Sequence, residues 1–362
     1  MSLRSQLRKE VYWSRRNAAA LLLVLLLLPG FFAASSVLFQ DVIPRDTPVA
    51  VVPQDEDVSS QELILVHAGT GTYADPVAVD STDEALRQLE REEVYAVVEV
   101  PANIDQAGND VTFRLYVDGT MVPFKEPSAT IATIMEGQLD DSLAADVTLE
   151  RIVVGNDHDL SAYLLPIALL ALIMLFAFTY VPYNLAQESR VIDRIRLESS
   201  VEALVGAKLL FFTALMFVPI VAFQVAVLAL DAVANVSFEH VTALAPGALL
   251  ALVLTFVTLA ALSMAVMVLT RFSTTGRFVN VVFLMGVAGF SGLAYPVGYF
   301  SPVRKAIVRA MPTHYATITV RSSMLRGSSL ATFADWVLGL AVVALLALLV
   351  LKLTIVYDRG WR

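Results

Sequence analysis

Six long stretches of apolar residues constrain this 362-residue chain more than any other feature. A helix needs roughly 20 apolar residues to cross about 30 Å of hydrocarbon, and a charged side chain inside such a helix is costly. Five of the stretches contain no Asp, Glu, Lys or Arg, and the sixth contains only Lys352, close enough to its end to reach the interface. The stretches are Ala18–Phe39, Leu160–Pro182, Leu209–Leu230, Val241–Thr270, Phe278–Phe300 and Trp336–Tyr357. We therefore predict an α-helical polytopic membrane protein with six transmembrane helices.

The composition supports this class and excludes others. The chain is 57% hydrophobic and 16% charged, whereas about a quarter of the residues in a soluble domain are charged. The absence of cysteine excludes disulfides and thiolate metal sites. The net charge of −9 argues against nucleic acid as a partner, because phosphate binding needs a basic surface.

Basic residues in the short flanking segments predict the orientation. Five bases and one acid precede the first span, which places the N-terminus in the cytoplasm. Counting spans then puts residues 40–159 outside the cell membrane, and the loop 183–208 and the C-terminus inside. Five basic residues disagree with this rule because they fall in the last external loop: Arg304, Lys305, Arg309, Arg321 and Arg326.

The first 39 residues have two alternative interpretations. Residues 17–39 are read as the first transmembrane helix, although a basic start followed by an apolar run and small residues also resembles a cleavable signal peptide. Residues 1–16 are read as a cytoplasmic amphipathic helix, because Leu3, Leu7 and Val11 recur every four positions beside basic residues. They could equally be a charged flank that only fixes the topology.

Residues 40–159 are predicted to form one extracytoplasmic α+β domain. Between Asp41 and Asp157 it carries 24 acidic and six basic side chains, a charge that high salt would screen and that suggests a halophilic source. Helices are expected from Thr82 and from Ile131 to Leu143. Strands are predicted, from β-branched residues bounded by Pro, Gly and Asp, at Pro48–Pro53, Gln61–His67, Val94–Val100 and Val111–Val117.

Signals of enzymatic chemistry are nearly absent. No GxxxxGK[ST] motif occurs, so the chain cannot hydrolyse ATP through a P-loop. The four histidines lack metal-ligand spacing, and the cluster Asp157–Asp159 is read as a solvated hinge where the chain returns to the membrane. No predicted span has a carboxylate at its centre, which argues against an ion-coupled secondary transporter. We therefore expect no catalytic site and no metal site in this chain.

Two motifs carry a resemblance to a known family. The cytoplasmic segment QESRVIDRIRLESSVEALVGAKLL, Gln187–Leu210, places a Glu, spaced Arg residues, a Ser and a Gly-x-Lys before the third span. SGLAYP follows at Ser291–Pro296, and a second proline at Ser301-Pro302. The segment Ala306–Gly327 then has a Pro-x-x-Tyr and an Arg before the last span. In these motifs, and in its order of one span, a large external domain and five spans, the chain resembles the type-2 ATP-binding-cassette (ABC) permeases of the drug- and sodium-exporter-like branch.

The resemblance implies roles for two sets of residues. The loop 183–208 would be the coupling loop that receives motion from an ATPase, although Val191–Asp193 stands where the family often has Gly-Thr. The external re-entrant region 297–333 would form short helices that break at Pro302 and Pro312, act as an outer gate and place basic residues at lipid headgroups. The coupling residues would be Glu188, Arg190, Arg194, Arg196, Glu198, Gly206 and Lys208, and the outer-gate residues Ser291, Gly292, Pro296, Pro302, Pro312, Tyr315 and Arg321.

The function implied is the permease subunit of an ABC exporter. Its partners would be a cytosolic ABC ATPase subunit, a second permease in a homodimer or heterodimer, and the lipid bilayer. The chain itself would hold no cofactor, because ATP and Mg²⁺ would bind to the ATPase. Two alternatives stay open: a membrane-anchored extracytoplasmic binding or sensing protein, for which five further spans are more than anchoring needs, and an ion-coupled secondary transporter.

Overall fold

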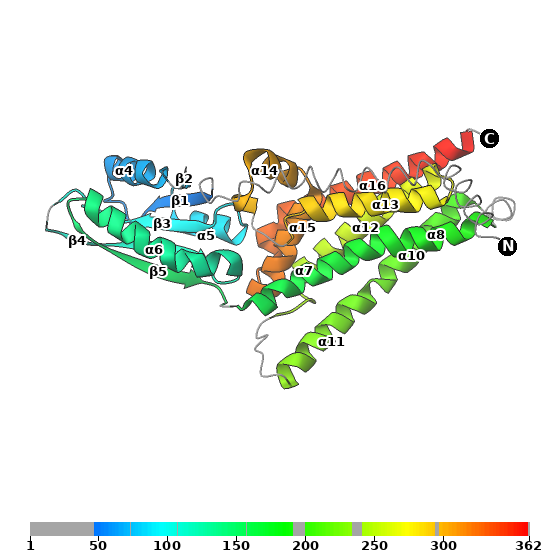
Figure 1. The fold of residues 1–362 in the computed structure, drawn as a ribbon, viewed down its shortest axis with the longest axis horizontal. Helices are drawn as coiled ribbons and strands as arrows, with labels where there is room; N and C mark the ends of the chain where they lie inside the picture. The colour runs from blue at the N-terminus through cyan, green and yellow to red at the C-terminus, as the bar shows by residue number, and fades with distance from the viewer. Residues whose placement is uncertain are drawn as a thin grey trace, which may run out of the picture.

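The chain contains two parts of different construction, shown in Figure 1. The computed structural model describes residues 47–72, 74–106, 108–156, 158–190, 200–233, 241–293 and 297–360. The predicted amphipathic helix of residues 1–16 and the first span Ala18–Phe39 lie outside the described residues. We call Thr47–Asn156 the sheet domain and Leu160–Gly360 the helical domain. The two follow one another along the long axis of the molecule.

The sheet domain is built on a five-stranded mixed sheet in the order β2-β1-β3-β4-β5. Neighbours pair in parallel except β3 and β4, which are antiparallel. At the end of the sheet next to the helical domain therefore lie the amino ends of β1, β2 and β3 and the carboxyl ends of β4 and β5. The strands are β1 (Pro48–Pro53), β2 (Asp75–Ala78), β3 (Ala96–Val100), β4 (Asp110–Asp118) and β5 (Asp146–Val154).

Three helices cover the two faces of this sheet. α4 and α6 pack on one face, around a core that includes the fully buried Phe113. α5 packs on the other face through Ala85 and Leu89. Burying an aromatic side chain such as Phe113 contributes on the order of 2–3 kcal/mol. The helices are α4 (Ser60–Thr70), α5 (Thr82–Glu90) and α6 (Val122–Ser142).

The structure confirms part of the predicted pattern and corrects one element. β1, β3, β4 and the helix from Thr82 occur where the sequence predicts them, and the helix predicted at Ile131–Leu143 begins earlier, at Val122. The predicted strand Gln61–His67 is wrong, because these residues belong to α4. Ser59 caps this helix by accepting a hydrogen bond from the backbone N–H of Glu62, whose carboxylate in turn accepts one from the backbone N–H of Ser59. This reciprocal capping box outweighs the β-branched composition that suggested a strand.

The helical domain contains four helices that are long and apolar enough to cross a membrane within the part of the chain that the structure describes. They span Leu160–Gln187, Val201–Ala229, Pro246–Leu269 and Leu330–Asp358. The first comprises α7 (Leu160–Leu175), the π-helical turn η3 (Phe176–Tyr180) and α8 (Val181–Gln187). The others are α10 (Val201–Leu215) with α11 (Phe217–Val233), α12 (Pro246–Leu269) and α16 (Ala334–Gly360).

The predicted span Phe278–Phe300 differs from the structure. The helix here, α13, runs from Thr274 to Phe290 and is shorter than the four candidate spans. It ends because Gly292 adopts a left-handed backbone conformation with φ of 68°, where a Cβ would approach Val297 Cγ2 to 2.9 Å. Gly292 therefore terminates the helix.

Short helices follow α13 and join it to α16. α14 (Pro302–Arg309) and α15 (Pro312–Arg321) each begin at a proline, which confirms the predicted breaks at these two residues. α15 continues into a π-helical turn, η6 (Ser322–Arg326). Two 3-10 turns, η5 (Val297–Tyr299) and η7 (Leu330–Phe333), complete the segment. α12 lies at the centre of the helical domain, where it packs against α15 and α16.

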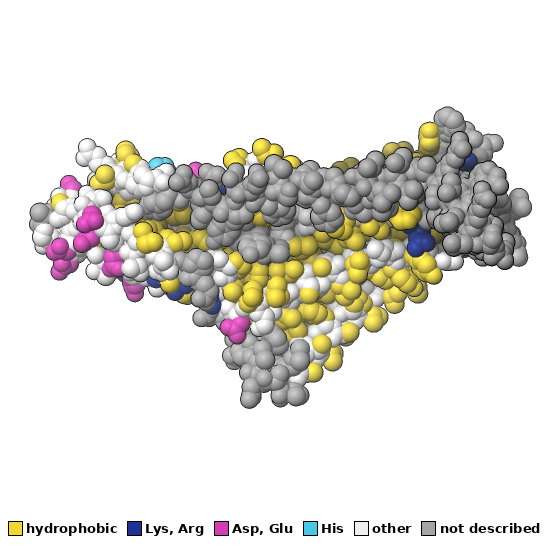
Figure 2. Space-filling model, viewed as in Figure 1, with side chains coloured by type: hydrophobic (Ala, Val, Ile, Leu, Met, Phe, Trp, Pro, Cys, Tyr) yellow, Lys and Arg dark blue, Asp and Glu magenta, His cyan; other side chains and the backbone are white. Residues whose placement is uncertain are grey.

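Exposed surfaces of the two parts differ in chemistry (Figure 2). Acidic side chains appear mainly over the sheet domain, whereas apolar side chains cover the helices in this view. Leu210, Leu338 and Leu345 are each about two-thirds exposed or more. Apolar surface of this extent on long helices is stable only against lipid or another apolar surface.

Candidate functional site

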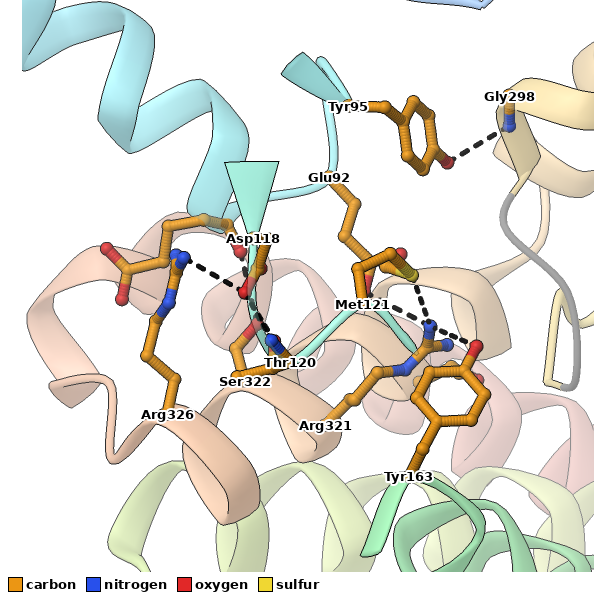
Figure 3. Close-up of polar contacts among 12 residues, drawn as sticks. Glu92, Tyr95, Asp118, Thr120, Met121, Tyr163, Gly298, Arg321, Ser322 and Arg326 are labelled. Carbon is orange, nitrogen blue, oxygen red and sulfur yellow. Dashed lines mark hydrogen bonds and ion pairs between the residues drawn. The ribbon is translucent and has the colours of Figure 1, made fainter. Parts of the chain in front are cut away.

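A buried ion pair joins the sheet domain to the helical domain (Figure 3). Arg321, at the end of α15, is 2% exposed, and its Nη1 lies 3.3 Å from Oε1 of Glu92. The same Nη1 donates a hydrogen bond of 2.9 Å to the Tyr163 hydroxyl at the start of α7. The guanidinium also lies 5.0 Å from the centre of the Tyr163 ring. Three segments that are far apart in the sequence therefore meet at one cation.

Glu92 reaches this position through an unusual backbone conformation. It stands between α5 and β3 with φ of 54°, a left-handed conformation that costs a non-glycine residue on the order of 1 kcal/mol. Only 5% of its side chain is exposed. This backbone conformation directs the Glu92 side chain to Arg321 of the helical domain.

A second ion pair lies beside the first. Asp118 ends β4, and its Oδ1 lies 3.1 Å from Nη2 of Arg326 in η6. The same oxygen accepts hydrogen bonds of 2.8 and 2.7 Å from the backbone N–H and the hydroxyl of Thr120. The adjacent Ser322 hydroxyl donates to the carbonyl of Glu90 at 3.1 Å. The π-helical turn η6 therefore contacts two separate loops of the sheet domain.

Two further contacts complete the interface. Arg91 holds Asp335 at 2.7 Å and stacks over the Trp336 ring at 4.4 Å, both at the start of α16. Tyr95 accepts a hydrogen bond of 3.0 Å from the backbone N–H of Gly298. Gly298 has no side chain to block this approach, since a Cβ there would lie 2.5 Å from the Tyr95 ring. We call the contacts centred on Glu92, Asp118, Arg321 and Arg326 the interdomain latch.

Burial changes the titration of the latch. It raises the pKa of the Glu92 carboxyl, and the nearby guanidinium of Arg321 opposes this shift only in part. Burial disfavours the charged form of Arg321, yet the Glu92 carboxylate holds the pKa of this guanidinium above its usual value. Because Arg keeps its proton at any pH at which a protein folds, only the carboxyl can adjust its charge. Burial also raises the pKa of the Tyr95 phenol.

The arrangement of the latch residues indicates a mechanical role and not a catalytic one. It holds fixed, buried charges without a nucleophile paired to a base, and the described residues contain no group of three or more His, Asp or Glu side chains that could hold a metal ion. A buried ion pair adds little net stability, but removing one partner costs roughly 3–5 kcal/mol. Such a pair therefore fixes the relative position of two elements.

A smaller polar cluster lies at the opposite end of the helical domain. Lys208 of α10 lies 2.8 Å from Oε1 of Glu188, and its Nζ donates a hydrogen bond of 2.5 Å to Oδ1 of Asn184 in α8. Figure 1 shows α8 and the start of α10 at the end away from the sheet domain. Nearby, the Arg277 guanidinium stacks over the Tyr183 ring at 5.1 Å. We call Asn184, Glu188 and Lys208 the loop-base cluster.

The predicted coupling residues are only partly described. The structure brings Glu188 and Lys208 together and places Gly206 on α10, where a Cβ would meet nothing within 4 Å. The backbone of Arg190 lies in the short turn η4 (Glu188–Arg190). Arg194, Arg196 and Glu198 lie outside the described residues.

The predicted gate residues are spread over one segment. Ser291 is buried and donates a hydrogen bond to the carbonyl of Ala288. Tyr315 packs edge-on against Trp336 and donates to the carbonyl of Arg309. Arg321 lies in the latch, and Pro296 lies outside the described residues. The structure places Gly292, Pro302 and Pro312 at helix boundaries.

Two sequence interpretations are wrong in this region. Arg304 and Arg321 were expected to meet lipid headgroups, but both are buried in protein, Arg304 over the Phe300 ring at 3.5 Å. His158 was read as part of a solvated hinge. It is 4% exposed, and its Nε2 lies 2.8 Å from the Leu325 carbonyl oxygen. Arg321 is paired with Glu92 of the sheet domain, whereas Arg304 donates a hydrogen bond of 3.3 Å to the carbonyl of Gly289 within the helical domain. The sequence alone treats these positions as a lipid or water boundary.

Several latch residues have no motif in the sequence. Glu92 and Asp118 are two acids among many in an acidic segment, and Tyr163 begins an apolar run. The available signal is Arg321, since an arginine close to the membrane needs a partner when it is not exposed. The sequence cannot indicate which of the nearby acids that partner is.

Comparison with known proteins gives one match. The family model described as "ABC-2 family transporter protein" matches residues 19–354, nearly the whole chain. No curated protein matches the chain, and no solved structure matches it.

Proposed function

The chain belongs to the ABC-2 family of transporter permeases, and on this premise we propose that it is the membrane subunit of an exporter driven by a separate cytosolic ATPase. The observation that carries the proposal is the family match over residues 19–354. The chain has no P-loop motif, so in this proposal ATP and Mg²⁺ bind to the partner. A second permease, identical or different, completes the complex.

The proposed topology has six spans and one external domain. The four candidate spans, α13 and the apolar stretch Ala18–Phe39 make up the six. The basic flank before Ala18 favours a cytoplasmic N-terminus. With the sheet domain outside, α8 ends and α10 begins on the cytoplasmic side, because both points lie at the end of the helical domain away from the sheet domain.

The proposed coupling element is the cytoplasmic segment 183–208. ATP-driven motion needs a contact that differs between two conformational states. The loop-base cluster supports this role, since Lys208 ties the ends of α8 and α10 together through Glu188. A force applied to the segment between these helices would move both of them together.

At the outer side, we assign the gate to the segment 291–326. Ser291 and Gly292 end α13, and Pro302 and Pro312 begin the short helices that follow. Arg321 and Arg326 connect this segment to the sheet domain through the latch. Movement of α15 would therefore be transmitted to the external domain.

A charge-swap experiment tests the coupling role. Lys208→Glu places a negative charge beside Glu188, so transport and transport-dependent ATP hydrolysis in the assembled complex should fall, because attraction becomes repulsion. The double swap Glu188→Lys/Lys208→Glu restores the pair and should recover most of the activity. Arg87→Glu, which breaks an exposed pair with Glu84 in the sheet domain, is the matched control. Full coupling in the Lys208→Glu complex would contradict the assignment.

A further inference from the structure

A cavity of about 400 Å³ opens at the end of the sheet that lies away from the helical domain, where β1 and β2 finish. Its wall consists largely of apolar side chains from β1, α4 and β2, among them Val51, Leu63, Ile64 and Ala78. Two polar side chains, His67 and Asp80, line it as well. A volume of this size and an apolar wall with few polar groups are typical of small-molecule sites.

The position of the cavity in the sheet supports a binding role. β1 and β2 are adjacent and parallel, and both end at the cavity, with Val51 paired to Ala78. The chain leaves β1 into α4 on one face and leaves β2 into α5 on the other face. Where the connections of adjacent parallel strands diverge in this way, a crevice forms at their carboxyl ends, and ligands of α/β proteins bind there.

The charge around the cavity determines which ligands fit. Asp80 lines the cavity, and the loop that follows β1 adds the exposed Asp55, Glu56 and Asp57 at the same end of the sheet. Among the described residues that line the cavity there is no Lys or Arg. An acidic rim attracts cations and repels anions, while the apolar wall favours a ligand with an apolar body.

We propose that this cavity is a binding site for small organic cations with an apolar body, such as aryl or alkyl ammonium and phosphonium ions. The cationic centre lies near Asp80, and the apolar groups fill the space between Leu63, Ile64 and Ala78. The proposal rests on the sheet domain alone and is independent of the direction of transport. It assigns the sheet domain a recognition role in addition to the latch.

The test uses two ions of nearly the same shape and opposite charge, tetraphenylphosphonium and tetraphenylborate. The full chain is reconstituted in phosphatidylcholine nanodiscs, and binding is measured by equilibrium dialysis with empty nanodiscs as the blank. Wild-type protein should bind tetraphenylphosphonium saturably, and tetraphenylborate should bind no more than to empty discs. Absence of saturable phosphonium binding, or equal binding of both ions, would overturn the proposal.

Two variants locate the site. Asp80→Asn should weaken phosphonium affinity about fivefold, as expected for loss of a charge near 4 Å in water. Ala78→Phe fills the cavity and should remove the saturable component, with an unchanged thermal midpoint as the check that the sheet domain still folds. Asp110→Asn removes an exposed charge at the start of β4 and should leave affinity unchanged. If phosphonium binding persists unaltered in both cavity variants, the site lies elsewhere and the proposal fails, without bearing on the permease function.

Discussion

Docking of the two domains should respond differently to the loss of Glu92 and to the loss of Arg321, the two residues of the buried ion pair. Glu92→Gln leaves the buried guanidinium of Arg321 without its carboxylate, and this cation cannot lose its proton. Arg321→Met leaves a buried carboxyl that can take up a proton instead. At 3.3 Å the pair attracts by about 5 kcal/mol with an effective dielectric constant near 20. We expect Glu92→Gln to weaken docking by about 3–5 kcal/mol and Arg321→Met by about 1–3 kcal/mol.

The double variant gives the sharpest contrast. Glu92→Gln/Arg321→Met removes both charges, so it should dock nearly as well as the wild type and better than Glu92→Gln alone. Docking of the two domains in the Arg321→Met variant should also depend on pH. Burial raises the folded-state pKa of Glu92. In the Arg321→Met variant, docking of the sheet domain on the helical domain should therefore be retained below the unfolded-state pKa of Glu, about 4, and lost as the pH rises through the folded-state pKa of Glu92.

Native-state hydrogen exchange measures this docking at one amide. The backbone N–H of Gly298 bonds to the Tyr95 hydroxyl across the interface, so it exchanges when the interface opens. A loss of 3–5 kcal/mol corresponds to exchange faster by roughly two to three and a half orders of magnitude. Amides within α12 serve as the internal control. Exchange at Gly298 that changes less than fivefold in Glu92→Gln, or additive effects in the double variant, would show that the Glu92–Arg321 pair does not hold the two domains together.

Burial lowers the pKa of His314 to about 4, so the protein should lose on the order of 3 kcal/mol of stability between pH 6.5 and pH 4 as the unfolded state takes up a proton, and thermal unfolding of His314→Asn should lack this pH-dependent step. Gly298→Ala should cost about 1–3 kcal/mol of thermal stability through its clash with the Tyr95 ring, and Tyr95→Leu should rescue it; a stable single variant would contradict the close packing. Because the chain has no cysteine, a single Cys at Gln61 should react with an impermeant thiol reagent in intact cells and one at Ser200 should not; the opposite pattern would reverse the proposed topology.

The sequence predicts a membrane protein because a long uncharged apolar run can adopt few structures other than a membrane-spanning helix. α12 and α16 occur close to the predicted stretches, since each is a long, nearly uncharged apolar run. The boundary of α13 was missed because Gly292 ends the helix inside an apolar run, where hydropathy does not change. α4 was missed because its signal is a capping box at Ser59 and its inner apolar residues suggested a strand.

The latch lies beyond what the sequence can show for a different reason. Glu92 and Arg321 are separated by more than 200 positions, and their contact depends on how the sheet domain docks on α15. Arg321 was assigned to the outer gate by resemblance to the family, yet its pairing with Glu92 needed the fold. Local patterns predict elements well, whereas contacts between charged residues of two domains require their relative placement.

In the proposed function, the chain moves its substrate with ATP hydrolysed by another subunit. The direct test is to purify the tagged full chain from its native membrane and measure ATP hydrolysis before and after the copurified proteins are removed. We predict that a cytosolic protein with a P-loop copurifies, that hydrolysis is found in this complex, and that the chain alone shows none above background. Hydrolysis by the verified pure chain, or a complex that contains no P-loop protein, would contradict the proposed role as a permease subunit.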